Sequence, residues 1–168
     1  RIGKVVLRPD SGDPVEIICG IKIFDLTEEV GRTDDLEVFQ SYAMEYISDR
    51  VRGETPHGEC GPYNESEIFK YNNNCYKVTV EFDWNRHDKQ YYYIDGERVI
   101  GCEKISLTPE QKGVIELLWD IFGGTISPQG YKVLDSHIGA IYGDSITLER
   151  AKQICERLKK KGFTSTNT

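Results

Sequence analysis

The sequence predicts an α/β protein whose 168 residues, taken together, mix helices and strands in an α+β arrangement. Two short apolar strands, near residues 4–8 and 138–142, each run into a polar loop and then a helix start, which is typical of parallel strands flanked by helices. Between them, residues 76–100 alternate apolar and polar side chains with a period of two. We therefore expect two strand–loop–helix units separated by an antiparallel β segment, with residues 76–100 forming strands.

The first unit begins with Val5–Leu7, a β-branched run that predicts a strand buried on both faces. Pro9 cannot donate to a β ladder and ends the strand, while Asp13 and Pro14 suit the N-cap and first position of a helix. The loop Arg8–Gly12 thus places a cation, a carboxylate, a hydroxyl and a glycine at the carboxyl end of a strand, where α/β proteins bind ligands. An ordinary turn remains the alternative, because Asp, Ser, Gly and Pro are also common turn residues.

The second unit begins with Ile138–Tyr142, an apolar strand that leads into Gly143-Asp144-Ser145. The helix expected after this loop ends at Gly162, and its predicted apolar face comprises Leu148, Ala151, Ile154, Cys155 and Leu158. Parallel strands place their carboxyl ends on one edge of a sheet, so the two Asp–Ser loops should be neighbouring rims of one site. The carboxylates of Asp10 and Asp144 are then expected to converge.

Three stretches resemble motifs of the nicotinamide phosphoribosyltransferase family. Arg8-Pro9-Asp10-Ser11-Gly12 resembles its ribose-phosphate loop, Gly143-Asp144-Ser145 resembles its second ribose-binding strand end, and residues 130–135 fit the pattern before that strand. The resemblance covers roughly residues 3–20 and 108–167, and it implies part of a type II phosphoribosyltransferase α/β barrel. In the family, a catalytic histidine and base-binding residues precede the first strand, and a Gly-rich phosphate loop follows a strand expected just after Thr168. The chain is therefore expected to be an interior piece of a longer enzyme, to contain no catalytic residue, and to be inactive alone.

The resemblance implies a pentosyltransferase of NAD biosynthesis and salvage. The family joins nicotinamide to 5-phosphoribosyl-1-pyrophosphate (PRPP), which gives nicotinamide mononucleotide and pyrophosphate. Arg8 would bind pyrophosphate or phosphate oxygens, Pro9 would hold the backbone, and Asp10 and Asp144 would accept hydrogen bonds from ribose hydroxyls. Gly143 would let the backbone approach the sugar. Mg2+ is expected with the pyrophosphate, and a cytoplasmic homodimer built with the rest of the same polypeptide is expected for the longer enzyme.

The segment from residue 21 to residue 107 has a different character. It contains an acidic stretch, a helix candidate at Leu36–Val51, a turn-rich segment at Gly53–Asn74, and three predicted strands at 76–82, 90–94 and 97–100. The turns between these strands are expected at 83–89 and at Asp95-Gly96. Compact members of the family carry the two motif strands much closer together. Residues 21–107 therefore look like an α+β subdomain inserted between barrel parts at 1–20 and 108–168.

A second α/β stretch starts at Thr108, which forms a capping box with Gln111 around Pro109. The apolar stripe that follows predicts one helix that continues to Gly123-Gly124. A basic cluster, Arg157 with Lys159–Lys161, lies near the end of the last predicted helix. We interpret this cluster as charge that complements a helix C-terminus, with a phosphate site as the alternative.

The bulk properties exclude several classes of protein. A net charge of −7 and a pI near 5.1 argue against non-specific nucleic-acid binding, and no apolar run approaches the roughly 20 residues of a membrane helix. Five cysteines without a CxxC pair indicate reduced thiols and no metal site.

Three alternatives to the nicotinamide enzyme stay open. The first is a nicotinate phosphoribosyltransferase, because the groups that would read the carboxamide lie outside the chain. The second is another phosphate-binding barrel enzyme, which would share Asp and Gly at its strand ends. The third is a non-catalytic interaction domain built around residues 21–107.

Overall fold

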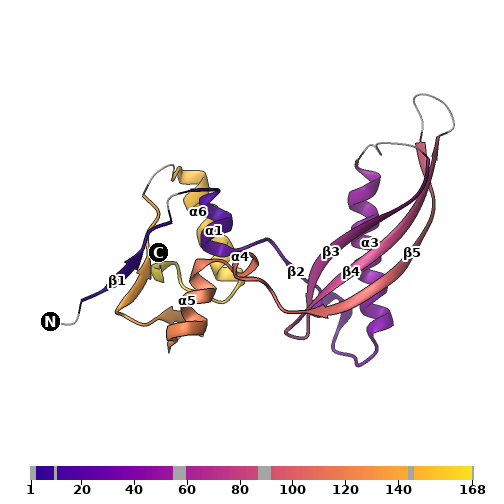
Figure 1. Cartoon of the computed structure of the whole chain (residues 1–168). Coiled ribbons are helices and arrows are strands. Elements are labelled where there is room, and N and C mark those ends of the chain that lie inside the picture. The colour runs from indigo at the N-terminus through magenta and orange to yellow at the C-terminus, as the bar shows by residue number, and fades with distance from the viewer. Residues whose placement is uncertain (1–2, 10, 55–59, 87–91, 144–145, 168) are drawn as a thin grey trace. The chain divides into compact units, whose positions relative to one another are not determined.

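The computed structural model describes residues 3–9, 11–54, 60–86, 92–143 and 146–167. The chain folds as two compact units, which we call the split unit (residues 1–22 and 107–168) and the central unit (residues 23–106) (Figure 1). These limits lie within two residues of the boundaries expected from the sequence. Both units contain helices and strands, so the fold is α+β.

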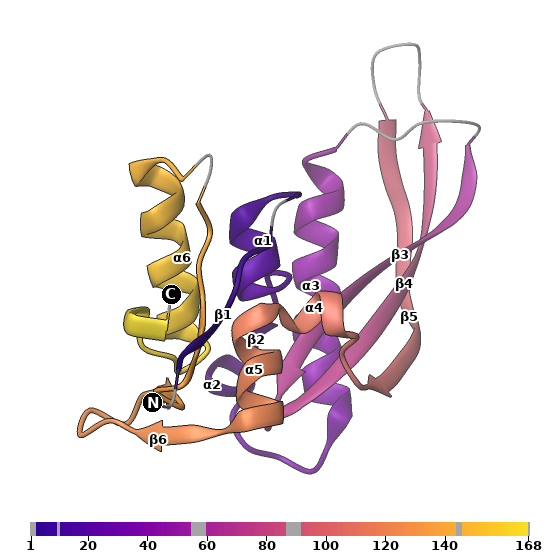
Figure 2. The ribbon, with the colours of Figure 1, turned by 60° about the vertical axis from the view of Figure 1, so that its left-hand side comes forward.

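Two parallel strands organise the split unit. Strand β1 (Val5–Leu7) pairs with β8 (Ile138–Ala140), with Val5 opposite Ile138 and Leu7 opposite Ala140. Helix α1 (Pro14–Cys19) follows β1, and α6 (Leu148–Lys160) follows β8. The expected pair of parallel strands, each followed by a helix, is confirmed (Figure 2).

The split unit also contains two short strands and two further α-helices. Strand β6 (Gly124–Ile126) runs antiparallel to β7 (Lys132–Leu134). Helices α4 (Pro109–Lys112) and α5 (Val114–Phe122) precede β6, and a 3-10 turn at Ser165–Asn167 follows α6. The buried core of this unit comprises Val15, Ile18, Cys19, Ile115, Leu118, Leu134, Ala140, Ile154, Leu158 and Phe163.

One long helix was expected after Thr108, and this expectation is wrong. The Thr108–Gln111 capping box is present, but Gly113 has a φ of 82° and separates α4 from α5. The reason is a backbone contact: a β-carbon on Gly113 would lie 2.2 Å from the backbone nitrogen of Gly20. The chain therefore needs glycine at both positions, and a continuous helix could not approach α1 as closely.

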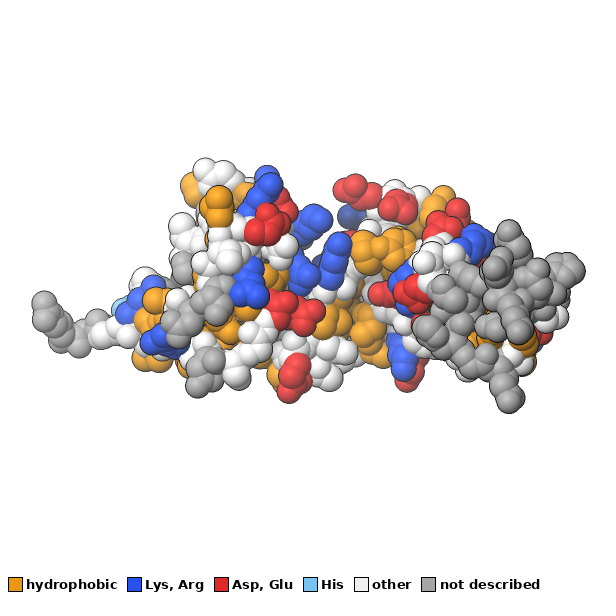
Figure 3. All heavy atoms as spheres, turned by 90° about the horizontal axis from the view of Figure 1, so that it is seen from above, with side chains coloured by type: hydrophobic (Ala, Val, Ile, Leu, Met, Phe, Trp, Pro, Cys, Tyr) orange, Lys and Arg blue, Asp and Glu red, His pale blue; other side chains and the backbone are white. Residues whose placement is uncertain are grey.

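The predicted burial of β1 is also wrong for this chain. Val5, Val6 and Leu7 are 61%, 47% and 46% exposed. Burial on both faces requires neighbouring strands and helices on each side, and among the described residues β1 has only β8 as a strand partner. Leu148 and Cys155, expected on the buried face of α6, are exposed as well. Figure 3 shows hydrophobic side chains at the surface of the split unit among charged ones.

The central unit is a four-stranded sheet with one long helix. Strand β2 (Phe24–Asp25) pairs in parallel with β3 (Gly61–Tyr71), and β3, β4 (Asn74–Arg86) and β5 (Tyr92–Ile105) pair antiparallel in the order β2-β3-β4-β5. A short helix, α2 (Thr27–Val30), precedes α3 (Leu36–Arg52). The helix predicted at 36–51 is therefore confirmed, and Asp35 caps it through the backbone nitrogen of Glu37. Residues 76–100 form strands wherever they are described.

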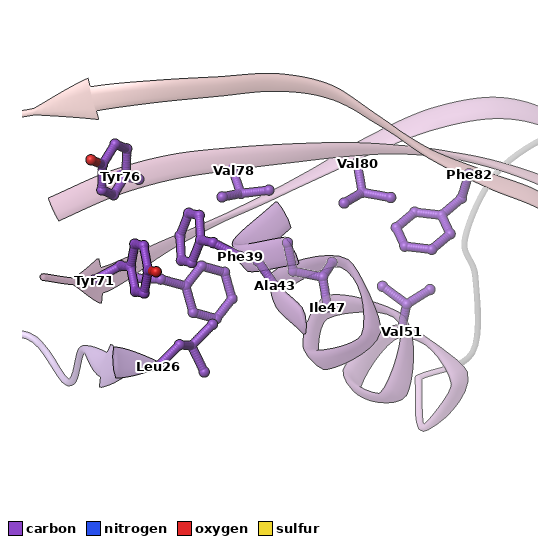
Figure 4. Close-up of a cluster of buried hydrophobic side chains, with 11 residues drawn as sticks. Leu26, Phe39, Ala43, Ile47, Val51, Tyr71, Tyr76, Val78, Val80 and Phe82 are labelled. Carbon is purple, nitrogen blue, oxygen red and sulfur yellow. The ribbon is translucent and has the colours of Figure 1, made fainter. Parts of the chain in front are cut away.

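A single apolar cluster holds α3 against the sheet (Figure 4). Phe39 stacks on Tyr71 with a ring separation of 4.9 Å, and Phe39 and Phe69 are fully buried. The buried members of the cluster are Leu26, Phe39, Ala43, Ile47, Val51, Phe69, Tyr71, Tyr76, Val78, Val80 and Phe82.

Two details of the predicted strands are wrong. The segment expected to be rich in turns contains β3, and the β3–β4 turn lies at Asn72 and Asn73, whose φ angles are 48° and 64°. Asp95-Gly96 makes no hairpin turn, because it lies inside β5. There the pairing of β4 with β5 shifts between Phe82 and Trp84, and Gly96 has a φ of 128°, which fits an irregularity within a strand. The expected turn at 83–89 lies partly outside the described residues.

No helix in the described part of the chain has both the length and the apolar character needed to span a membrane.

Candidate functional site

The two predicted site loops leave the same edge of the β1–β8 sheet. The pairing continues past the strands, because the backbone nitrogen of Ile141 donates to the carbonyl oxygen of Leu7 at 2.9 Å. Residues 8–13 and 141–147 therefore start side by side. Of the predicted site residues, Arg8, Pro9 and Gly143 are described, whereas Asp10 and Asp144 lie outside the described residues. The expected convergence of the two carboxylates stays a prediction.

Arg8 from the first loop lies on Gly143 of the second. A β-carbon built on Gly143 would be 2.5 Å from Nη2 of Arg8 and 3.0 Å from its Cζ. Real β-carbons do not approach a neighbour so closely, so any larger residue would displace the guanidinium. Arg8 and Gly143 were expected to belong to one site, and in the structure the two residues are in contact.

Tyr142 makes the opposite connection, from the second loop to the first. Its hydroxyl donates to the carbonyl oxygen of Gly12 at 2.9 Å, across 130 positions of sequence. Sequence reasoning treated Tyr142 only as the end of an apolar strand. The available signal was its hydroxyl, placed directly before Gly143 at the predicted rim.

The end of the first loop, at Gly12 and Asp13, is also fixed by its own residues. Gly12 has a φ of 93°, which favours glycine, and the Asp13 carboxylate accepts a hydrogen bond from the backbone nitrogen of Val15 at 2.9 Å. The Asp13 carboxylate is thus engaged at the N-terminus of α1.

Two members of the basic cluster at the end of α6, Arg157 and Lys161, bind backbone carbonyl groups. The ammonium group of Lys161 donates to the carbonyl oxygens of Cys19 (2.8 Å) and Lys112 (2.7 Å) and lies 2.6 Å from Glu116 Oε2. Arg157 donates to the carbonyl oxygen of Gly20 at 3.1 Å. These cations therefore lie at the C-termini of α1 and α4, where positive charge is favourable. The sequence predicted that this cluster complements the C-terminus of its own helix on a solvated face. Arg157 and Lys161 instead contact the C-termini of α1 and α4, and both side chains are half-buried.

Cys19 and His137 are not suitable as catalytic groups. Burial raises the pKa of the Cys19 thiol to about 11, against the opposing effect of Arg157 and Lys161, so the thiol stays protonated near neutral pH. His137 precedes β8 and so lies at the opposite end of that strand from the two loops. Hydrogen bonds from the backbone and ring of His137 lower the pKa of the Asp135 carboxyl.

The five cysteines are all free. In the described ranges, no three or more His, Cys, Asp or Glu side chains are grouped so that they could hold a metal ion.

Comparisons with known proteins identify relatives of part of this sequence. The model of the nicotinate phosphoribosyltransferase (NAPRTase) family matches residues 85–168, which is half of the chain. A nicotinamide phosphoribosyltransferase of Acinetobacter baylyi is 58% identical over 60 residues, which are 36% of this chain and 12% of the relative. Proteins of the same name from Mycoplasma pneumoniae and Mycoplasma genitalium are 46% identical over 69 residues (39% and 15%) and 44% identical over 54 residues (32% and 12%).

The matched stretches thus span 12% to 15% of the length of these curated relatives. No solved structure matches the chain. The resemblance drawn from the motif residues is confirmed, and the chain belongs to the nicotinate phosphoribosyltransferase (NAPRTase) family.

Proposed function

We propose that the chain is part of a longer phosphoribosyltransferase that joins nicotinamide to PRPP and releases nicotinamide mononucleotide and pyrophosphate. The observation that carries the proposal is the contact between Arg8 and Gly143, which brings together two loops that leave one edge of a parallel sheet. The printed names of the three relatives supply the reaction.

Arg8 serves the leaving group in this proposal. When the bond between ribose and pyrophosphate breaks, negative charge grows on the pyrophosphate oxygens. The planar, positively charged guanidinium can donate to two oxygens at once, so it stabilises the negative charge on the pyrophosphate. Its position on the Gly143 backbone directs it toward the second loop.

The ribose is assigned to Asp10, Asp144 and Gly143. Carboxylates accept hydrogen bonds from ribose hydroxyls, and their charge stabilises the positive charge that develops on the sugar ring during transfer. Gly143 leaves the backbone open to close approach, and Pro9 restricts the backbone between Arg8 and Asp10. None of these residues is assigned a proton transfer, so the chain supplies binding groups and the chemical step needs residues from elsewhere in the enzyme.

Magnesium belongs to this proposal as the companion of the pyrophosphate. The metal would neutralise part of the pyrophosphate charge, and pyrophosphate oxygens are the hard ligands that it prefers. The described residues offer no carboxylate cluster that would hold the ion by itself, so we assign the ion to the substrate oxygens.

The architecture of the longer enzyme is proposed as well. The split unit is assigned to a type II phosphoribosyltransferase barrel, and the central unit to an insertion between α1 and α4. The insertion therefore follows a helix, whereas the sequence pattern suggested one of the strand-to-helix loops. We also propose that the longer enzyme is a cytoplasmic homodimer. The five free cysteines support a reducing compartment such as the cytoplasm.

Nicotinate is the second candidate substrate, because the matched family is described by the nicotinate reaction whereas the relatives are named for nicotinamide. The test is a coupled assay of the longer enzyme with PRPP, Mg2+ and either base. We expect nicotinamide mononucleotide and pyrophosphate in equal amounts, and no turnover by the 168-residue chain alone. Product from nicotinate only would replace the substrate assignment, and no product from either base would overturn the proposal.

A further inference from the structure

Tyr142 and Arg8 connect the two site loops in opposite directions. Arg8 extends from the loop after β1 onto Gly143, and Tyr142 extends from the segment after β8 to the carbonyl oxygen of Gly12. Both connections therefore join the same two loops, and they lie at different points of the first loop, at its first residue and near its end.

The hydrogen bond to Gly12 fixes the part of the first loop that strand pairing does not reach. Pairing with the second strand ends at Leu7, whose carbonyl accepts from Ile141, and the α1 cap begins at Asp13. Gly12 lies between these anchors in a left-handed backbone conformation, which is the conformation that glycine adopts most freely. Without the Tyr142 hydroxyl, Gly12 would lose its hydrogen bond to the segment that follows β8.

We propose that Tyr142 is a positioning residue, which holds the Arg8–Asp13 loop through Gly12 and thereby sets where the Arg8 guanidinium meets the phosphate oxygens of PRPP. The inference rests on the proposed function, since it names the substrate group that Arg8 binds. Tyr142 itself does not touch the substrate in this account. The ring of Tyr142 is half-buried and packs against the split-unit core, so the hydroxyl and the ring have separable roles.

The test is Tyr142→Phe in the longer enzyme that contains this chain, because this change removes the hydroxyl and keeps the ring. We expect the KM for PRPP to rise about three- to tenfold, as for the loss of one hydrogen bond that orders a binding group, with kcat and the KM for nicotinamide changed less than about twofold. Amide hydrogen exchange measured on the same protein should become faster in peptides that span residues 8–13.

Tyr71→Phe is the matched control. The Tyr71 hydroxyl also donates a hydrogen bond to a loop, at the carbonyl oxygen of Gly31 (2.7 Å), but Tyr71 lies in the central unit. This variant should speed exchange around residues 31–33 and leave the KM for PRPP unchanged.

Wild-type exchange at residues 8–13 in Tyr142→Phe would overturn the proposal. Faster exchange with an unchanged KM for PRPP would overturn it too, because the hydrogen bond would then be structural only. A wild-type enzyme that makes no mononucleotide would instead overturn the proposed function, and the exchange rates would still decide whether Tyr142 holds the loop.

Discussion

The two units of the chain bury their apolar side chains to very different degrees. In the central unit, the sheet and α3 enclose a cluster in which Phe39, Phe69 and Phe82 have no exposed surface. In the split unit, β1 is largely exposed and Ile121 at the end of α5 is 70% exposed. The central unit therefore has the features of a self-sufficient domain, whereas the loops assigned to substrate lie on a sheet that is covered only in part.

The largest effect is expected from separating the units. Residues 23–106 expressed alone should fold cooperatively, because their core is complete. The split unit can be tested by joining residues 1–22 to residues 107–168 with a short Gly–Ser linker. This protein should also fold, because the backbone nitrogen of Ile21 already donates to the carbonyl oxygen of Gln111 at 3.0 Å. It should melt at a lower temperature than the central unit. Thermal unfolding followed by circular dichroism measures the melting temperatures of both proteins. If residues 23–106 are unfolded on their own, the central unit is not a self-sufficient domain.

A substitution in the core of the central unit should destabilise that unit and leave the split unit unchanged. Phe39→Ala removes a fully buried ring that stacks on Tyr71, so we expect a loss of about 3–5 kcal/mol in the free energy of unfolding of the central unit. Tyr42→Ala, on the exposed side of the same helix, is the control and should cost much less. Because the split unit has its own core, hydrogen-exchange protection in residues 148–160 should not change. A loss of that protection would show that the units fold as one.

Lys161→Ala should weaken the split unit by a smaller amount. It leaves two carbonyl oxygens, of Cys19 and Lys112, without the ammonium that binds them, and we expect a cost of about 1–3 kcal/mol. The neighbouring Lys160 is exposed, so Lys160→Ala should be close to neutral. Urea unfolding of the chain measures both changes. Equal effects of the two substitutions would show that the carbonyl contacts contribute nothing specific.

Much of the fold follows from local signals in the sequence. The predicted caps at Asp13 and Thr108 are both present, because each depends only on a side chain and the next few backbone nitrogens. The parallel pairing of β1 with β8 also matched, since matching strand–loop–helix patterns favour adjacent strands.

Features that depend on distant partners could not be predicted. Strand β3 was hidden because Glu65 and Glu67, which look like surface residues, face Arg50 of α3 at 3.1 Å each. The break at Gly113 depends on contact with Gly20, more than 90 positions away. The exposure of Val5–Leu7 depends on what covers the strand, which its β-branched composition does not specify.

In the candidate site too, features with a local sequence signal were predicted and a feature that depends on a distant partner was not. The motif residues were found because glycine, carboxylate and arginine have recognisable chemistry at strand ends. Tyr142 was missed because its partner is a backbone carbonyl, and no sequence pattern marks which carbonyl a tyrosine reaches.

The central claim is that Arg8 and Gly143 act together on PRPP, and a double-mutant cycle in the longer enzyme tests it most directly. Arg8→Ala and Gly143→Ala should each lower kcat/KM for PRPP, which corresponds to a loss of about 1–3 kcal/mol in transition-state stabilisation. The first change removes the guanidinium and the second displaces it. Melting temperatures should change little, because Gly143 has an ordinary backbone conformation and Arg8 is exposed. In the Arg8→Ala background, the part of the Gly143→Ala effect that comes from displacing the guanidinium should disappear, and the remainder measures the lost approach of the ribose to the Gly143 backbone. Fully additive effects, or wild-type kcat/KM in both single variants, would contradict the account.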